Sequence, residues 1–199
     1  MQRARVVPAA ITPVLVITGP SGVGKGTLIG ALLERCPGMQ LSVSATTRSP
    51  REGEVNGRDY HFLSGQEFEE RVGRDEFVEH AEYAGNRYGT LRSELERPAR
   101  GIVLEIDLQG ARQVRDTLPG ATQVFIAPPS LEALEHRLRG RASDSEEQIA
   151  RRLEVAPTEL AAQEEFARVV ENDDLGAALE ELVELAASIS APDERSPNP

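Results

Sequence analysis

Short runs of apolar, β-branched residues alternate along this chain with stretches of helical spacing. The run at residues 14–17 stops at a Gly-Pro pair and predicts a buried strand. Residues 27–35 repeat apolar positions at helical intervals and predict a helix that ends before Pro37. Further strands are predicted at 102–106, 122–126 and 169–170, and further helices at about 110–117, 130–139, 145–167 and 175–188. Strands and helices that alternate in this way predict an α/β fold with a parallel sheet covered on both faces.

Two residues mark boundaries within these helical stretches. Ser130 has the side chain of a helix N-cap and predicts the start of the 130–139 helix. Pro157 is expected to split or kink the long 145–167 stretch, because proline lacks the amide hydrogen that an inner helix position donates.

Residues 42–92 interrupt the alternation. This stretch is rich in turn residues and polar side chains, and Asn56-Gly57 is a hairpin-type turn signal. Tyr60 and Tyr88 stand in its turn-flanked polar segments. We therefore expect a small mixed α+β lobe, inserted between the units of the parallel sheet.

The charge of the chain changes which partners are plausible. Its 199 residues, enough for one domain with an inserted lobe, carry 22 basic and 33 acidic side chains and a net charge of −11. This balance argues against a general nucleic-acid binder and against docking on an anionic membrane. The acidic excess lies wholly in residues 101–199, where we expect it on solvated helix faces. Lys25 is the only lysine in the chain.

The remaining composition points to a reducing compartment. Cys36 is the single cysteine, so no disulfide within the chain is possible. Residues 1–13 lack the long apolar segment of a signal peptide, and no apolar run near the start is long enough to span a membrane. We expect a flexible extension at 1–13, a flexible tail at 189–199 and a cytoplasmic location.

The strongest chemical signal is a glycine-rich loop between the first predicted strand and helix. It has the spacing of a phosphate-binding loop and consists of Gly19, Pro20, Ser21, Gly22, Val23, Gly24, Lys25, Gly26 and Thr27. Glycines let successive backbone N–H groups approach phosphate oxygens, and the helix N-terminus adds partial positive charge. The Lys25 ammonium can then reach the β- and γ-phosphates of a nucleotide.

One position of this loop departs from the usual pattern. A serine or threonine that binds Mg²⁺ normally follows the lysine, whereas this chain has Gly26 there and Thr27 one residue later. We expect either that water and phosphate alone hold the metal or that Thr27 takes part.

Motors, switches, ATPases and kinases all use such a loop. The side chains of the polar lobe distinguish between these classes of protein. Arg48 and Arg51 can bind phosphate oxygens bidentately, and the Tyr60 hydroxyl can add a neutral donor. These side chains suit a second phosphate, on an acceptor rather than on the donor nucleotide. The side chains of Ser44, Glu79 and Thr90 can read a base edge, since a carboxylate matches guanine N1–H and N2–H and a hydroxyl can donate to O6.

Several motifs in order make the chain resemble the guanylate kinase family. They are residues 19–27, 42–62, 76–90, 104–111, 125–130 and 169–175. The resemblance covers the chain from 14 to about 185. It implies a P-loop NTPase-type core at 14–42 and 93–188, a GMP-binding lobe at 43–92 and a helical lid at 137–153. It also implies the reaction of ATP with GMP, assisted by Mg²⁺, to give ADP and GDP.

The resemblance assigns roles to single residues. Arg48, Arg51, Tyr60 and Tyr88 would hold the GMP phosphate, Glu54 would orient the arginines, and Ser44, Glu79, Thr90 and Asp107 would face guanine. Arg137, Arg141 and Arg152 would approach the ATP phosphates when the lid closes, and Asn172 would lie beside adenine. Asp107 has an alternative role as an acceptor for Mg²⁺-bound water. His61, His80 and His136 lack metal-ligand spacing and are expected to be structural or surface residues.

Two features remain open at this level. The chain between Gly89 and the 102–106 strand is a few residues shorter than the family pattern, so the shape of a helix there is not predicted. The function has two alternatives, which are a P-loop phosphotransferase with another acceptor and a catalytically silent interaction module of guanylate kinase type. We expect ATP and GMP as small-molecule partners and a monomer or a small homo-oligomer.

Overall fold

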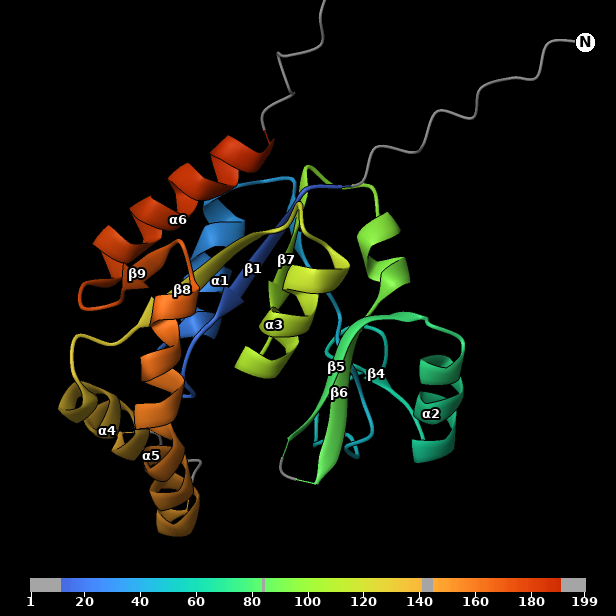
Figure 1. Ribbon diagram of the computed structural model, residues 1–199, viewed down its shortest axis with the longest axis horizontal. Coiled ribbons are helices and arrows are strands. Elements are labelled where there is room, and N and C mark those ends of the chain that lie inside the picture. The colour runs from blue at the N-terminus through green and yellow to red at the C-terminus, as the bar shows by residue number, and fades with distance from the viewer. Residues whose placement is uncertain (1–11, 84, 141–144, 191–199) are drawn as a thin grey trace, which may run out of the picture.

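Five parallel strands form the central sheet of the protein, for which the computed structural model describes residues 12–83, 85–140 and 145–190 (Figure 1). The strands are β1 (Val14–Thr18), β2 (Met39–Leu41), β7 (Gly101–Glu105), β8 (Thr122–Ala127) and β9 (Val169–Glu171), in the order β2-β7-β1-β8-β9. In the register, Val16 of β1 pairs with Leu104 on one side and Gln123 on the other. The α/β class and the four strands predicted for this sheet are confirmed, and β2 is an addition.

Helices cover both faces of this sheet. They are α1 (Lys25–Arg35), α3 (Leu108–Thr117), α4 (Leu131–Arg139), α5 (Glu146–Ala161) and α6 (Leu175–Ser190). Leu15 and Ile17 of β1 pack in one buried cluster with residues of α1, α4, α5 and α6. Val14 and Val16 point to the opposite face and pack in a second cluster, with residues of α3. The alternation of side chains along one strand thus divides the core into two halves.

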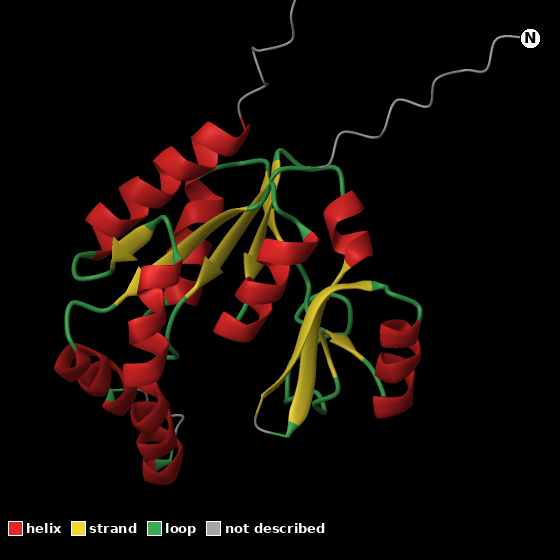
Figure 2. Cartoon of the chain, viewed as in Figure 1, coloured by secondary structure: helices red, strands yellow, loops and turns green. Residues whose placement is uncertain are grey.

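A smaller mixed sheet lies beside the central one (Figure 2). Its strands are β3 (Ala45–Thr46), β4 (His61–Phe62), β5 (Phe77–Tyr83) and β6 (Asn86–Leu91), in the order β4-β3-β6-β5. Helix α2 (Gly65–Gly73) starts with a capping box between Ser64 and Glu67 and packs on this sheet. Phe68 of α2 stacks on Phe77 of β5, with ring centroids 4.5 Å apart. We refer to residues 43–92, which contain this sheet, as the lobe.

Helix α3, which covers the central sheet, also packs against the lobe. Its side chains form hydrogen bonds with backbone groups of β5, which is an edge strand of the lobe sheet. The Gln113 side-chain amide donates to the His80 carbonyl at 2.7 Å and accepts from the His80 N–H at 3.1 Å. The Thr117 hydroxyl donates to the Val78 carbonyl at 2.9 Å. These bonds satisfy polar groups that a sheet edge would otherwise leave open.

Of the two outcomes expected at Pro157, a split or a kink of the 145–167 helix, the split is wrong. Helix α5 passes through Pro157 to Ala161 and is followed by a 3₁₀ helix at Ala162–Glu165. The side of α5 that carries Ile149 and Ala156 is buried in the core, whereas Pro157 itself is exposed. Packing of this apolar side outweighs the loss of one helical hydrogen bond. Ser145 and Ser130 cap α5 and α4, the second as predicted.

Two local expectations for the lobe have different outcomes. Asn56-Gly57 does form a turn, in which the Gly57 N–H donates to the Tyr60 carbonyl at 2.8 Å, but it is not a hairpin. The strands on either side of it, β3 and β4, pair in parallel. After β6 the shortened segment forms only a 3₁₀ helix at Arg92–Glu96.

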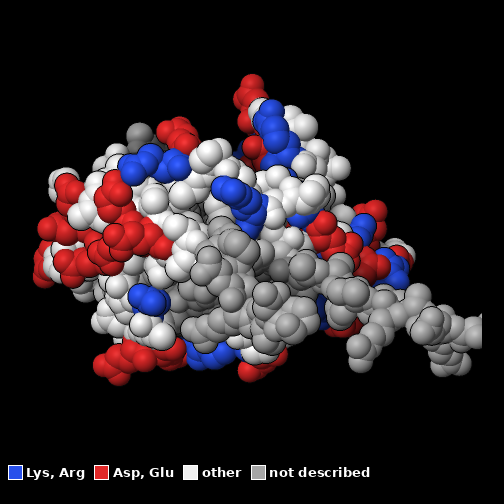
Figure 3. Space-filling view, turned by 90° about the horizontal axis from the view of Figure 1, so that it is seen from above, with Lys and Arg blue, Asp and Glu red and all other residues white. Residues whose placement is uncertain are grey.

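Acidic side chains crowd the side of the molecule on which α6 lies (Figure 3). On this helix Glu180, Glu181 and Glu184 are exposed, in agreement with the expected solvated face. Among the described residues, no helix has the length and apolar character needed to cross a membrane. Apart from Thr12, Pro13 and residues 189–190, the expected extension and tail lie outside the described residues.

Candidate active site

The glycine-rich loop connects β1 to α1, as predicted, and its glycines have a structural reason. Gly19, Gly22 and Gly24 have φ angles of 140°, 89° and 101°, which side chains rarely adopt. A Cβ atom on Gly24 would also lie only 2.6 Å from the Asn172 amide nitrogen. Gly24 is the N-cap of α1 and has no side chain to occupy the first turn. The backbone N–H groups of that turn can therefore bind an anion.

Lys25 is the first residue of α1, and its side chain folds back over the loop. Its Nζ atom donates to the carbonyls of Gly19 at 2.7 Å and Pro20 at 3.0 Å. These contacts place the ammonium at the mouth of the loop, next to the ends of β1 and β7.

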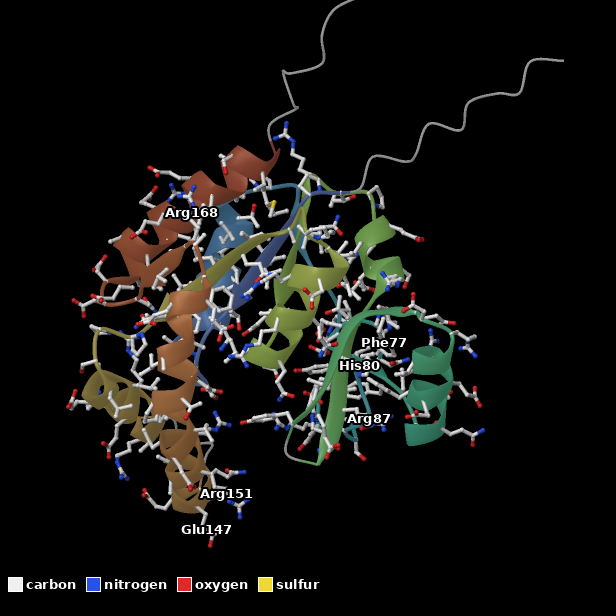
Figure 4. All side chains as sticks on the ribbon, viewed as in Figure 1. Phe77, His80, Arg87, Glu147, Arg151 and Arg168 are labelled. Carbon is white, nitrogen blue, oxygen red and sulfur yellow. The ribbon has the colours of Figure 1, made fainter. Side chains whose placement is uncertain are left out.

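A cleft of about 420 Å³ opens between this loop and the lobe. It is lined by Gly19, Ser21, Lys25, Leu41, Ser42, Ser44, Asp59, Tyr60, Glu79, Ala81, Tyr83, Tyr88, Gly89, Glu105, Ile106, Asp107, Arg152 and Glu159. Figure 4 labels Arg151 near the start of α5 and Arg87 on strand β6 of the lobe; these two parts of the chain lie on either side of the cleft, although neither residue lines it. The tertiary structure thus brings the loop, the lobe and α5 to one cavity.

Glu79 is the most unusual carboxylate of this cleft. Its side chain is almost fully buried, and its Oε1 accepts a hydrogen bond from the Thr90 hydroxyl at 2.7 Å. Burial raises the pKa of Glu79 to about 7, with a smaller contribution from the negative charge of Asp107, while the Thr90 bond opposes the shift. Thr90 has no exposed surface, so it lies behind Glu79 and not at the cleft wall. Its position suits orientation of the carboxylate rather than direct contact with a base.

The predicted phosphate-binding arginines lie at the side of the cleft and are not among its lining residues. Arg48 forms a two-bonded ion pair with Glu54, at 2.8 and 3.0 Å, and its guanidinium lies 5.2 Å from the ring centre of Tyr60. Glu54 also accepts the backbone N–H of Arg51 at 2.7 Å, and the Arg51 side chain is exposed. Tyr88 lies 6.3 Å from Tyr60, measured between ring centres. Glu54 therefore orients the guanidinium of Arg48 but only the backbone of Arg51.

A second hollow lies on the other side of the loop. It is lined by Gly22, Val23, Gly24, Thr27, His136, Arg137, Gly140, Asn172, Asp173 and Leu175. The Asn172 amide donates to the Val23 carbonyl at 2.8 Å, and Arg137 donates to the Asn172 carbonyl at 2.7 Å. Helix α4 and the end of β9 are thereby tied to the phosphate-binding loop.

Comparison with known proteins assigns this architecture to a family. The family model described as guanylate kinase matches residues 12–188. The chain belongs to the guanylate kinase family. It is 56% identical over 174 residues to the guanylate kinase of Synechocystis, with 86% of this chain and 91% of that protein covered. It is 55% identical over 176 residues to the one of Synechococcus elongatus, covering 87% and 96%.

A solved structure agrees with these relatives. The crystal structure of guanylate kinase from Anaplasma phagocytophilum matches with a TM-score of 0.71 and 30% identity, over 92% of this chain and 88% of that one. The chain is thus an enzyme of the guanylate kinase family. The comparisons favour neither of the two alternative functions.

The acidic and basic side chains of the cleft in this guanylate kinase family member include expected and unexpected residues. Arg152 donates to the Ser21 hydroxyl at 2.8 Å and lines the cleft, whereas Arg141 lies outside the described residues. Sequence reasoning missed Glu105 and Glu159, which both line the cleft. For Glu159 a signal exists in retrospect, because it follows Arg152 by seven residues and so shares its side of the helix.

Whether Mg²⁺ fits this site depends on the oxygen donors that lie near Lys25. Within the described part of the chain, no group of three or more acidic, His or Cys side chains could hold a metal ion. Asp107 lines the cleft but uses Oδ1 to cap α3, accepting from the Gly110 N–H at 2.8 Å. Thr27 lies in the second hollow and not beside Lys25. This donor set suits an ion held mainly by phosphate and water.

Proposed function

We propose that this protein transfers the γ-phosphoryl group of ATP to GMP in the cleft between the glycine-rich loop and the lobe. The products are ADP and GDP. The observation that carries this proposal is that Lys25, which suits a donor phosphate, and Glu79, which suits a guanine, line one cavity. Family membership supports the same reaction.

The acceptor GMP would bind on the lobe side of the cleft. The Glu79 carboxylate would accept hydrogen bonds from guanine N1–H and N2–H, and Ser44 would donate to O6. Thr90 would hold Glu79 in place from behind, and Asp107 would face the same base. The GMP phosphate would be held at the edge of the cleft by Arg48, Arg51, Tyr60 and Tyr88. Glu54 would orient the guanidinium of Arg48 and the backbone of Arg51.

The donor ATP would extend across the loop from the second hollow to Lys25. Adenine would lie near Asn172, and the backbone N–H groups of residues 19–27 would bind the phosphates, together with the partial charge of the α1 N-terminus. Thr27 would face the α-phosphate from its place in the second hollow. Lys25 would leave its two carbonyl partners and bind the β- and γ-phosphate oxygens.

Residues 137–153 would act as a lid in this mechanism. Arg137 and Arg152 would turn from their present partners on the loop and the β9 end to the ATP phosphates, and Arg141 would join them. Closure would also exclude water, which otherwise competes with GMP as the phosphoryl acceptor. The lid belongs to a domain that we place at 14–188, with the core at 14–42 and 93–188 and the lobe at 43–92.

Mg²⁺ would be held by ATP phosphate oxygens and water, with Asp107 and Glu105 accepting hydrogen bonds from that water. When bound, it neutralises phosphate charge and polarises the phosphoryl group. The residues of this chain would supply position and charge. The acceptor oxygen of GMP attacks the γ-phosphorus, the bond from that phosphorus to the bridging oxygen breaks, and the arginines and Lys25 stabilise the spread negative charge.

Three further properties belong to this proposal. Acceptance of dGMP follows because the acceptor contacts named above involve base and phosphate, not the ribose 2′-hydroxyl. A cytoplasmic location fits the single cysteine. The protein would act on free nucleotides, not on nucleic acid or membranes, as a monomer or a small homo-oligomer.

The direct test is a comparison of acceptors. Phosphorylation is measured with ATP and Mg²⁺ and with GMP, AMP, CMP or UMP as the acceptor. GMP should be used far better than the other three. Activity with AMP and none with GMP would reject the acceptor assignment, and no turnover with any acceptor would support a silent module.

A further inference from the structure

Glu94 is a buried carboxylate at the point where the chain returns from the lobe to the core. It lies in the 3₁₀ helix Arg92–Glu96, directly after the last lobe strand β6, and only 7% of its surface is exposed. It is not among the residues that line the cleft, and no step of the mechanism above uses it. A buried charge needs compensating hydrogen bonds, so the partners of Glu94 show which parts of the protein it joins.

Both carboxylate oxygens of Glu94 accept hydrogen bonds. Oε2 accepts from the backbone N–H of Val43 and from the Arg97 guanidinium, each at 2.8 Å. Oε1 lies 3.0 Å from Nε2 of His61, which donates to it because an ionised carboxylate can only accept. Burial alone would raise the pKa of Glu94, but these three partners outweigh it and lower the pKa below its ordinary value. The carboxylate is therefore charged at neutral pH.

The partners of Glu94 come from both chain segments that connect the lobe to the core. Val43 lies on the outgoing segment, between β2 of the central sheet and β3 of the lobe. Arg97 lies on the returning segment, and its guanidinium also donates to the Leu41 carbonyl of β2 at 3.2 Å. His61 belongs to β4, which is an edge strand of the lobe sheet. One carboxylate thus joins the two connecting segments to each other and to one edge of the lobe.

Two partners of Glu94 are sequence neighbours of residues that we assign to the acceptor. Val43 precedes Ser44, which would bind guanine, and His61 follows Tyr60, which would bind the GMP phosphate. The backbone N–H of His61 also donates to the Ser44 carbonyl at 2.9 Å, so the lobe sheet itself keeps these two segments together. The opposite edge, β5, is attached to the core separately, by the bonds from α3 described above. Without Glu94 the lobe would keep its internal bonds and its attachment at β5 but would lose this connection at β3 and β4.

We propose that Glu94 is a positioning residue for phosphoryl transfer. It holds the β3–β4 side of the lobe in a fixed place relative to the core, and so sets the distance between GMP on the lobe and ATP on the loop. This inference rests on the proposed function, because that function assigns the two nucleotides to these two parts. Loss of Glu94 should leave each nucleotide bound but slow the reaction between them, since phosphoryl transfer depends steeply on the placement of the reacting atoms.

The first test is Glu94→Ala, which removes all three bonds. The matched control is Glu96→Ala, the same change at an exposed position of the same 3₁₀ helix. The kcat is measured at saturating ATP and GMP and is normalised to folded protein by circular dichroism. The dissociation constant of each nucleotide is measured separately by calorimetric titration. We expect Glu94→Ala to lower kcat at least about tenfold and to change either dissociation constant less than about threefold, whereas Glu96→Ala should match the wild type.

The second test changes a single bond and decides the matter if Glu94→Ala does not fold. His61→Leu removes the group that donates to Glu94, whereas the side-chain amide nitrogen of His61→Gln can take the place of Nε2. His61→Leu should lower kcat about threefold or more, as for the loss of one hydrogen bond. His61→Gln should restore kcat to within about twofold of the wild type.

Three results would overturn the inference. The first is a folded Glu94→Ala protein with the kcat of Glu96→Ala, and the second is an equal kcat for His61→Leu and His61→Gln. The third is a loss of GMP affinity as large as the loss of kcat, because Glu94 would then shape the GMP site itself. Failure of the proposed function would be seen separately, since the wild-type protein would then not phosphorylate GMP.

Discussion

Because Gly110 has no side chain, the carboxylate of Glu79 fits in the space beside it. Adding a single methyl group at Gly110 should therefore disturb this carboxylate. Gly110 is in the first turn of α3 and is buried. A Cβ atom added there would lie 2.5 Å from Glu79 Oε2 and 3.1 Å from its carboxyl carbon. Because Thr90 holds the other oxygen at 2.7 Å, the carboxylate cannot move away without loss of that bond. Gly110→Ala should therefore displace the group that we assign to guanine.

The size of the effect follows from these distances. An ordinary carbon–oxygen contact is about 3.3 Å or longer, so the carboxylate must shift by about 1 Å. Hydrogen bonds to a charged group contribute about 1.5–3 kcal/mol each, and about 1.4 kcal/mol corresponds to a factor of ten. Loss of one guanine bond should raise the KM for GMP about 10- to 100-fold. The KM for ATP should remain within about twofold, because Gly110 does not line the second hollow.

The assay is steady-state kinetics with each substrate varied, combined with thermal melting. Gly30→Ala is the control, since Gly30 also lies in a helix and a Cβ there would meet no atom within 4 Å. Both variants gain helix propensity, up to about 1 kcal/mol, but only Gly110→Ala should lose affinity for GMP. An unchanged KM for GMP in Gly110→Ala would refute the assignment of Glu79 as the guanine-binding carboxylate.

Four further predictions concern the loop and the lobe. Lys25→Ala should lower kcat at least about 100-fold with little change in melting temperature, and a near-normal kcat would show that the loop is not the site of phosphoryl transfer. Arg48→Ala should raise the KM for GMP about tenfold or more and leave the KM for ATP nearly unchanged, whereas equal effects on both would contradict the lobe assignment. Because the pKa of Glu79 is about 7 and guanine needs the ionised carboxylate, the KM for GMP should fall about tenfold from about pH 6 to about pH 8, and Glu79→Gln should lack this change. The raised pKa also affects stability. The contribution of Glu79 to stability declines as the pH rises from 4.5, the ordinary pKa of a glutamate, to about 7, the pKa of Glu79 in the folded protein. Glu79→Gln should therefore melt at a higher temperature than the wild type at about pH 8.

The sequence by itself determined the parts of this protein that depend on local rules. Strand β1, the glycine-rich loop and helix α1 could be predicted together, because the apolar run, the glycine spacing and the helical period each act over a few neighbouring residues. The positive φ angles of Gly19, Gly22 and Gly24 follow from the same local requirement. The α/β class follows from the alternation of such units.

Contacts between distant segments were decided only by the tertiary structure. Thr90 lies behind Glu79, since packing of the lobe leaves it no exposed surface. Helix α5 continues through Pro157, because its buried side gains more from packing than one hydrogen bond is worth. Glu159 lines the same cleft as Ser21 and Lys25, which are more than 130 residues away in the sequence. A sequence pattern encodes which face of an element is apolar, but the partner of that face depends on how all the elements pack together.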